Sequence, residues 1–136
     1  MLYTNTITVR FSETDLAGHV NNAVYLTYLE EARMHFVRQV LLVDEVPLIL
    51  ASVRLDFLRQ VFFGDTLTIE SGVCRLGTTS FDMAHHLYRD NGHRLALIGL
   101  ATLVRFDYRT QTPEPISEEW RNKLTPYTTV APLSRT

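Results

Sequence analysis

The sequence predicts an α+β domain in which one long helix lies across one face of a curved antiparallel sheet of about five strands. Three observations support this fold class. Several short segments alternate apolar and polar residues, one segment of about twenty residues has helical spacing, and turn-forming residues separate the alternating segments. A chain of 136 residues is the size of one ordinary domain, so we expect a single domain over residues 1–136.

A strand is predicted at the start of the chain. Ile7, Val9 and Phe11 alternate with Thr8 and Arg10 there. This two-residue period is typical of a strand with one buried face.

A helix is predicted from residue 22 to about residue 42. Apolar side chains recur at steps of three and four in this segment, while polar side chains fall on another side. The apolar positions are Tyr25, Tyr28, Leu29, Ala32, Phe36 and Val40. This is the one long element that can cover the apolar face of a sheet.

Alternation returns after Pro47 and predicts four further strands, around residues 53–57, 67–69, 81–87 and 95–106. Turn-forming residues separate these strands, namely Gly64-Asp65, Gly77 and the hairpin signal Asp90-Asn91-Gly92. Consecutive strands joined by tight turns must be antiparallel. A short helical turn follows around residues 117–124, with Ser117 as a candidate N-cap.

Composition argues against several classes of partner. Thirteen basic and fifteen acidic residues are mixed along the chain, without the basic block that nucleic-acid binding requires. No apolar run reaches the ~20 residues of a membrane span, and the N-terminus lacks the pattern of a signal peptide. A single cysteine, Cys74, fits a reducing compartment. We therefore expect a cytoplasmic protein without nucleic-acid or membrane partners.

Metal and cofactor sites are not expected. His85 and His86 are adjacent in a predicted strand and so point to opposite faces, which prevents chelation by the pair. There is no other cluster of cysteine or histidine in the sequence.

The stretch "ETDLAGHVNNAVYLTYLEEAR" carries the polar residues from which a site can be built. Asn21 or Asn22 is a good N-cap for the helix, whose first backbone N–H groups have no partner inside it. Such groups stabilise a carboxylate, a phosphate or a developing oxyanion. Asp15 lies in a loop that Gly18 must bend back towards this end of the helix.

A carboxylate beside an oxyanion hole is suited to acyl transfer. The carboxylate attacks the acyl carbon or activates water, and the amides stabilise charge on the carbonyl oxygen. His19 is expected to be neutral near the positive helix end, where it acts as a donor, a base or an anchor. Taken singly, these residues are also common turn formers and caps.

The same stretch resembles the hotdog-fold thioesterases of the 4-hydroxybenzoyl-CoA thioesterase type, in the branch with an Asp-x-x-Gly-His-Val-Asn-Asn-x-x-Tyr motif. The matching positions are Asp15, Gly18, His19, Val20, Asn21, Asn22 and Tyr25, continued by Tyr28, Glu30, Ala32 and Arg33. The resemblance implies a hotdog fold and a homodimer or homotetramer with active sites between subunits.

The resemblance also implies roles for individual residues. Asp15 would be the catalytic nucleophile or base, with His19 sharing or replacing that role, and the Asn22 backbone N–H would polarise the thioester carbonyl. Glu30 would pair with Arg33 to steady the helix. Candidate substrate-binding residues are Gly18, Ala23, Tyr25, Phe57, Arg59 and Ser80.

The candidate substrate-binding residues include two for the acyl group and one for the CoA phosphates. Tyr25 and Phe57 are candidates to wall an acyl pocket, and Arg59 is a candidate to meet CoA phosphates. Some relatives carry basic side chains just before the Ser-Phe of the hairpin, whereas this chain has Thr78 and Thr79 before Ser80. This departure indicates a different nucleotide site or a different carrier.

The function expected from the sequence is hydrolysis of an acyl-CoA thioester to free acid and CoA, with no metal and no cofactor. The alternatives are an acyl-ACP thioesterase, a hydratase-like hotdog protein, and a non-catalytic acyl-thioester binding or assembly module. Fold alone does not separate them.

Overall fold

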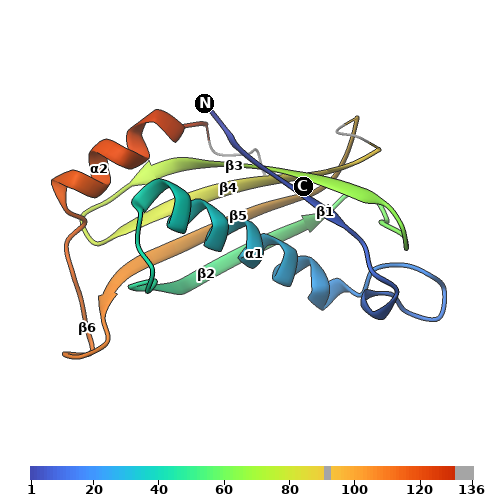
Figure 1. Ribbon diagram of the computed structural model, residues 1–136, viewed down its shortest axis with the longest axis horizontal. Coiled ribbons are helices and arrows are strands. Elements are labelled where there is room, and N and C mark those ends of the chain that lie inside the picture. The colour runs from blue at the N-terminus through green and yellow to red at the C-terminus, as the bar shows by residue number, and fades with distance from the viewer. Residues whose placement is uncertain (91–92, 131–136) are drawn as a thin grey trace.

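The computed structural model describes residues 1–90 and 93–130, which form one long helix against one antiparallel sheet (Figure 1). In chain order the elements are β1 (Tyr3–Thr8), a 3-10 turn (Phe11–Glu13), α1 (Asn22–Leu41), β2 (Leu48–Phe57), β3 (Thr66–Leu76), β4 (Ser80–Arg89), β5 (Arg94–Asp107), β6 (Thr112–Pro113), α2 (Glu118–Leu124) and a second 3-10 turn (Thr125–Tyr127). The predicted α+β class and the order of strand, helix and four strands are confirmed.

The sheet has the strand order β1-β3-β4-β5-β2, with every pair of neighbours antiparallel. Tight connections join β3 to β4 and β4 to β5, as predicted, although Asn91 and Gly92 of the second turn lie outside the described residues. The prediction was wrong for β2 and β3, which are not neighbours. Residues 58–65 instead cross the end of the sheet, because β2 pairs with β5 rather than with the next strand along the chain.

The first strand is shorter than predicted. β1 ends at Thr8, and Phe11 lies in the 3-10 turn with 75% of its surface exposed. Val9 remains buried, and its amide donates to Asp65 O at 2.9 Å while its carbonyl accepts from Gly64 N at 3.2 Å. These two bonds tie the end of β1 to the crossover before β3.

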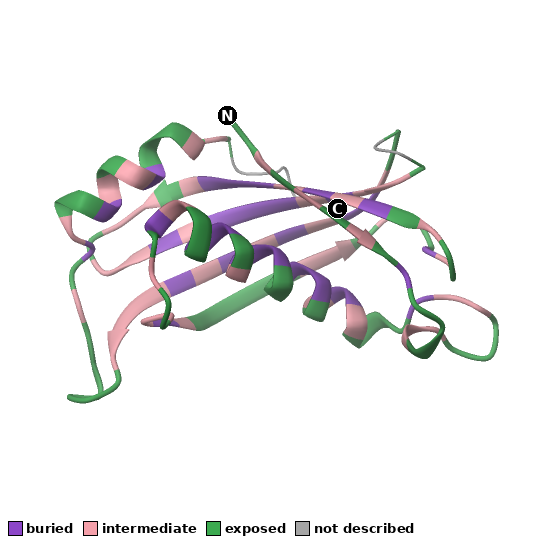
Figure 2. Ribbon diagram, viewed as in Figure 1, coloured by how far each residue is buried: buried purple, intermediate pink, exposed green. Residues whose placement is uncertain are grey.

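The apolar face of α1 covers the concave face of the sheet, as the helical spacing predicted (Figure 2). Leu29, Ala32 and Phe36 are fully buried on it. The helix approaches the sheet closely at Gly99 of β5, where an added Cβ would lie 2.5 Å from Leu29 Cδ1. A side chain at position 99 would therefore require the buried Leu29 side chain, or α1 itself, to shift.

The second helix is also confirmed. Ser117 Oγ accepts a hydrogen bond from Trp120 N at 3.2 Å, which is the N-cap interaction expected at that position. Trp120 and Leu124 pack under the end of α1 that is distant from the polar stretch. Among residues 1–90 and 93–130, no helix combines the length and apolar character needed to cross a membrane.

A polar side chain lies in the centre of the core. His85 of β4 is completely buried, with its Nδ1 2.8 Å from Ser71 Oγ and its Nε2 without a hydrogen-bond partner among the described residues. Burial, followed by the nearby charges of Arg33 and His86, lowers the pKa of His85 to about 3. The folded protein therefore holds this imidazole in its neutral form at neutral pH.

This buried histidine predicts a specific dependence of stability on pH. The pKa of histidine in an unfolded chain is about 6.5, so between pH 6.5 and 3 the unfolded state binds a proton that the folded state does not. The contribution of His85 is present above pH 6.5 and is lost as pH falls, by about 1.4 kcal/mol per pH unit. Urea unfolding of the wild type and His85→Gln at pH 7 and pH 5 measures it. The variant should show a smaller loss, and equal losses would contradict the assignment.

Candidate active site

The loop between the first 3-10 turn and α1 is closed by Asp15. One carboxylate oxygen, Oδ1, accepts hydrogen bonds from Ala17 N at 2.9 Å and from His19 N at 3.1 Å. The Asp15 amide in turn donates to His19 O at 2.8 Å. Gly18 has φ +82°, the left-handed conformation that glycine adopts without steric cost, as the sequence indicated. The loop thus fixes an exposed carboxylate in one orientation.

The start of α1 follows this loop directly. Asn21 is the N-cap: its side-chain oxygen accepts from Ala23 N at 3.0 Å and its carbonyl from Val24 N at 2.9 Å. Asn22 is the first residue of the helix and is exposed. Within the described part of the chain, the Asn22 N–H is the first amide of α1 left without an acceptor, so it remains available to a ligand oxygen.

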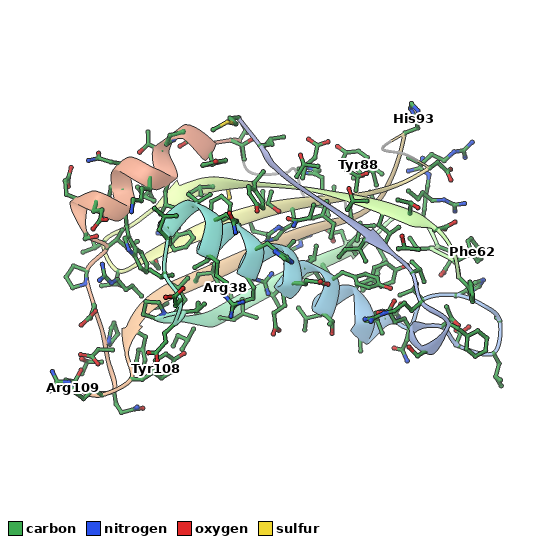
Figure 3. All side chains as sticks on the ribbon, viewed as in Figure 1. Arg38, Phe62, Tyr88, His93, Tyr108 and Arg109 are labelled. Carbon is green, nitrogen blue, oxygen red and sulfur yellow. The ribbon has the colours of Figure 1, made fainter. Side chains whose placement is uncertain are left out.

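The crossover between β2 and β3 supports the same loop from the other side. Val20 N donates to Val61 O at 2.8 Å, and residues 19 and 62 form an isolated antiparallel bridge. The rings of His19 and Phe62 meet edge to face at 5.0 Å, and Phe62 lies beside the loop in Figure 3. This contact holds His19 at the loop without a hydrogen bond to its ring among the described residues.

A small pocket of about 150 Å³ opens at the start of α1. It is lined by Asn22, Tyr25, Phe57, Leu58, Arg59 and Gln60. Tyr25 is buried and its ring packs edge to face on Phe57 at 5.4 Å, while Phe57 remains 47% exposed at the end of β2. The structure thus brings the helix start together with Tyr25, Phe57 and Arg59 from the predicted set.

Glu13 is a residue of this region that sequence reasoning missed. Its carboxylate accepts hydrogen bonds from the Tyr28 hydroxyl at 2.8 Å and the Arg10 amide at 2.8 Å, and its backbone carbonyl accepts from Asn21 N at 3.0 Å. Burial by itself raises the pKa of Glu13, but these hydrogen bonds and the Arg10 charge outweigh it and leave the pKa below its usual value. An ionised Glu13 therefore ties the loop to the body of α1.

The one feature of the sequence that could have pointed to Glu13 was its spacing from Arg10. The two residues are three apart and form an ion pair at 3.2 Å in which the Arg10 side chain is exposed and that of Glu13 is largely covered. The more important partner, Tyr28, is fifteen residues away in sequence and becomes a neighbour only because α1 folds back over the loop.

Two predicted substrate-binding residues, Arg59 and Ser80, form hydrogen bonds within the chain, and Ser80 also lies far from the helix start. One guanidinium nitrogen of Arg59 donates to Leu95 O, which orients the exposed side chain beside the pocket at the helix start. Ser80 accepts a hydrogen bond from Arg75 at 2.7 Å at the start of β4. Leu87, the β4 residue paired through β5 with Phe57, lies seven residues from Ser80, or about 23 Å along the strand. Within one chain, Ser80 therefore lies far from the start of α1.

Arg33 also departs from its predicted role. We expected an ion pair with Glu30 that steadies the helix, but Arg33 is buried, and it makes no ion pair within 4.0 Å in the described part of the chain. Position 33 shares the inward face of α1 with Leu29 and Phe36, which are one turn away on either side. In the same residues, no group of three or more histidine, cysteine, aspartate or glutamate side chains could hold a metal ion.

A helix wrapped by a single curved antiparallel sheet, with a carboxylate loop at the helix start, defines a hotdog protein. The thioesterase-like superfamily matches residues 9–124, so the chain belongs to that family. All the elements of the candidate site from Asp15 to Arg59 lie inside the matched segment.

Two individual relatives are similar to this chain over much of its length. The chain is 28% identical over 123 residues to the long-chain acyl-CoA thioesterase FadM of Escherichia coli K12, covering 87% of this chain and 93% of that protein. It is 35% identical over 86 residues to the uncharacterized protein YsmA of Bacillus subtilis, covering 61% of this chain and 58% of that one.

A solved structure of a thioesterase from Thermus thermophilus, complexed with coenzyme A and zinc, has the same fold. It matches with a TM-score of 0.82 and 30% identity, over 91% of this chain and 92% of that chain. Family, relatives and fold together indicate thioester hydrolase chemistry.

Proposed function

We propose that this protein hydrolyses acyl-CoA thioesters, with Asp15 as the catalytic carboxylate and the Asn22 N–H as an oxyanion donor. The observation that carries the proposal is the arrangement around the start of α1. A carboxylate is held by two backbone amides in a loop that leads directly to the free N-terminal amide of a twenty-residue helix. The similarity to a long-chain acyl-CoA thioesterase supports CoA as the carrier.

The chemistry follows from these groups. Oδ1 of Asp15 is occupied by the Ala17 and His19 amides, which leaves Oδ2 to act on the substrate. It either attacks the thioester carbon or takes a proton from the water that does so. Negative charge then develops on the carbonyl oxygen and is stabilised by the Asn22 N–H and the helix dipole. On the base route, collapse of this intermediate expels the CoA thiolate and leaves the free acid. On the nucleophile route, it expels the thiolate and leaves a mixed anhydride on Asp15, which a water molecule then hydrolyses to the free acid. In both cases the thiolate leaves as CoA after taking up a proton.

His19 has a secondary role in this proposal. Its amide helps to orient Asp15, and its ring is fixed against Phe62 rather than hydrogen bonded to the carboxylate. Gly18 and Ala23 form the turn and the first helical turn against which the substrate lies. Tyr25 and Phe57 wall the acyl group.

The site requires a second copy of the chain. A pocket of about 150 Å³ is smaller than the 300–1,000 Å³ typical of ligand sites. β2 lies at an edge of the sheet, and Leu50, Val53 and Phe57 are each more than a third exposed along it. We infer that β2 pairs with the β2 of a second chain, which covers these side chains and supplies the other wall of the site.

The proposed activity is tested by following free thiol release from short, medium, long and aromatic acyl-CoAs, with acyl-ACP as a parallel substrate. We expect saturable release of CoA from at least one acyl-CoA. Release from acyl-ACP alone would assign the other carrier. A folded protein that binds acyl-CoA without releasing thiol would contradict hydrolysis and favour the binding-module alternative.

A further inference from the structure

The segments on either side of the Asp15 loop form a short antiparallel ladder. The Asp15 amide donates to His19 O at 2.8 Å, and the Asn21 amide donates to Glu13 O at 3.0 Å. One isolated bridge lies between these two bonds. Asp15 lies at the loop end of the ladder, and Asn21, the N-cap of α1, lies at its base. The ladder therefore sets where the Asp15 carboxylate lies relative to the first amides of the helix.

A side chain also ties the base of this ladder to the body of α1. The Tyr28 hydroxyl donates to Glu13 Oε1 at 2.8 Å, and Tyr28 is 1% exposed. Tyr28 lies six residues after Asn22, or about 9 Å along the helix axis. The loop and the helix are thus joined at two separated points, covalently at residues 21–22 and by the hydrogen bond at Tyr28. Two points of attachment oppose a tilt of the ladder about the helix start, which one point alone permits.

The carboxylate that accepts this bond is itself fixed in place. Glu13 Oε1 also accepts from Arg10 N at 2.8 Å, and Oε2 pairs with the Arg10 guanidinium at 3.2 Å. The Glu13 side chain is 12% exposed, whereas that of Arg10 is 79% exposed. The backbone amide and the buried hydroxyl therefore hold the carboxylate more firmly than the solvated ion pair does.

The contacts from the crossover between β2 and β3 act on another part of the loop. Val20 N donates to Val61 O at 2.8 Å, and Phe63 N donates to Gly18 O at 3.3 Å. These bonds join the loop to residues 58–65. The bond at Glu13 instead fixes the loop against α1, the helix that carries the proposed oxyanion donor.

We propose that Glu13 is a positioning residue for thioester hydrolysis, which through its bond to Tyr28 holds the Asp15 carboxylate in register with the Asn22 N–H. The inference rests on the proposed function and deepens it, since the carboxylate and the amide must reach one thioester carbonyl at the same time. Glu13 does not touch the reacting atoms, because both of its oxygens are engaged with Tyr28 and Arg10. Loss of this bond changes the rate without changing which groups carry out the chemistry.

Three variants test this role by thiol release from an acyl-CoA that the wild type hydrolyses. Tyr28→Phe removes the hydroxyl alone, and it should lower kcat by about tenfold with KM within about twofold, because a shift of about 1 Å in a reacting group costs up to about 10²-fold in rate. Glu13→Ala should lower kcat at least as far. Glu13→Gln keeps an oxygen for the Tyr28 hydroxyl and should retain kcat within about threefold of the wild type. Wild-type kcat in both Tyr28→Phe and Glu13→Ala would overturn the proposal.

A matched control removes a similar hydroxyl elsewhere in the sheet. Thr102 Oγ1 donates to Asp82 Oδ1 at 2.7 Å, and Asp82 also pairs with an arginine. Thr102 lies five residues along β5, or about 17 Å, from the residue that pairs with Phe57. Thr102→Val should keep the wild-type kcat. If it lowered kcat as far as Tyr28→Phe, loss of any such bond would slow the enzyme, which contradicts a specific role for Glu13.

A double variant separates positioning from a general loss of structure. If Glu13 acts through Asp15, the combination of Asp15→Asn with Tyr28→Phe should be no slower than Asp15→Asn alone. A general loss of structure would instead slow both backgrounds by the same factor, and that result would contradict the proposal.

Amide hydrogen exchange, followed by NMR, separates failure of this inference from failure of the proposed function. In Tyr28→Phe, the Ala17 and His19 amides, which donate to Asp15 Oδ1, should exchange at least about threefold faster than in the wild type. Thiol release that is lost in Asp15→Asn but unchanged in Tyr28→Phe would overturn this inference and leave the proposed function standing. No release by the wild type would overturn the proposed function, and unchanged exchange in Tyr28→Phe would then overturn the positioning of the loop as well.

Discussion

Asp15→Asn is expected to lower kcat for acyl-CoA hydrolysis by about 10²–10⁴-fold, the range that a positioned carboxylate base contributes. The amide keeps an oxygen where Oδ1 accepts from the Ala17 and His19 amides, so the turn is retained. It removes the negative charge that either attacks the thioester or takes a proton from water. KM should change little, because Asp15 acts mainly in the transition state.

Matched variants at two positions separate chemistry from loop structure. Asp15→Ala removes the charge and both turn hydrogen bonds, so it should lower kcat as far as Asp15→Asn and also reduce Tm. His19→Gln keeps the amide that orients Asp15 and loses only the ring against Phe62. Thiol release at saturating acyl-CoA gives kcat for all three. Full activity in Asp15→Asn with loss in His19→Gln would assign the catalytic role to His19.

The carboxylate loop could be predicted because its determinants are local. Asp15, Gly18 and Asn21 act through hydrogen bonds to residues two to four positions away, or through a backbone conformation of their own. The N-cap prediction left two candidates, and the structure selects Asn21, since its side chain rather than that of Asn22 binds the second helical amide. Turn and cap chemistry of this kind can be read directly from sequence.

The supporting contacts could not be predicted because they depend on the strand order. Turn signals indicate that two strands are close in sequence, not that they are neighbours in a sheet, so the crossover from β2 to β3 was mistaken for a hairpin. That crossover brings Val61 and Phe62 to the loop. The hydrogen bond from Tyr28 to Glu13 likewise exists only because α1 folds back over the loop.

Arg33 shows that position on a helix can outweigh residue type as a guide to burial. Arg33 was predicted to pair with Glu30 and steady the helix, a role that the family resemblance implied. Steps of three and four from Leu29, Phe36 and Val37 instead place it on the inward face of α1, where it is 4% exposed. Sequence gives the angular position of a residue on a helix but not the shape of the surface it meets.

Val53→Lys is expected to break the proposed β2–β2 dimer into folded monomers and to abolish thioesterase activity. Val53 lies near the middle of β2 and is 38% exposed in one chain, so a lysine can reach solvent there without unfolding the sheet. A two-fold antiparallel pairing of β2 with its copy brings the middles of the two strands together. Two lysines would then face each other in a partly desolvated interface, which like charges oppose.

The opposite edge of the sheet supplies the matched control. β1 is also an edge strand, and Thr6→Lys places the same charge near its middle. We expect Thr6→Lys to remain dimeric and active. Light scattering after size exclusion gives the mass of each variant, and thiol release gives its activity. A monomeric Val53→Lys with full activity would show that one chain completes the site, against the argument that a 150 Å³ pocket needs a wall from its partner.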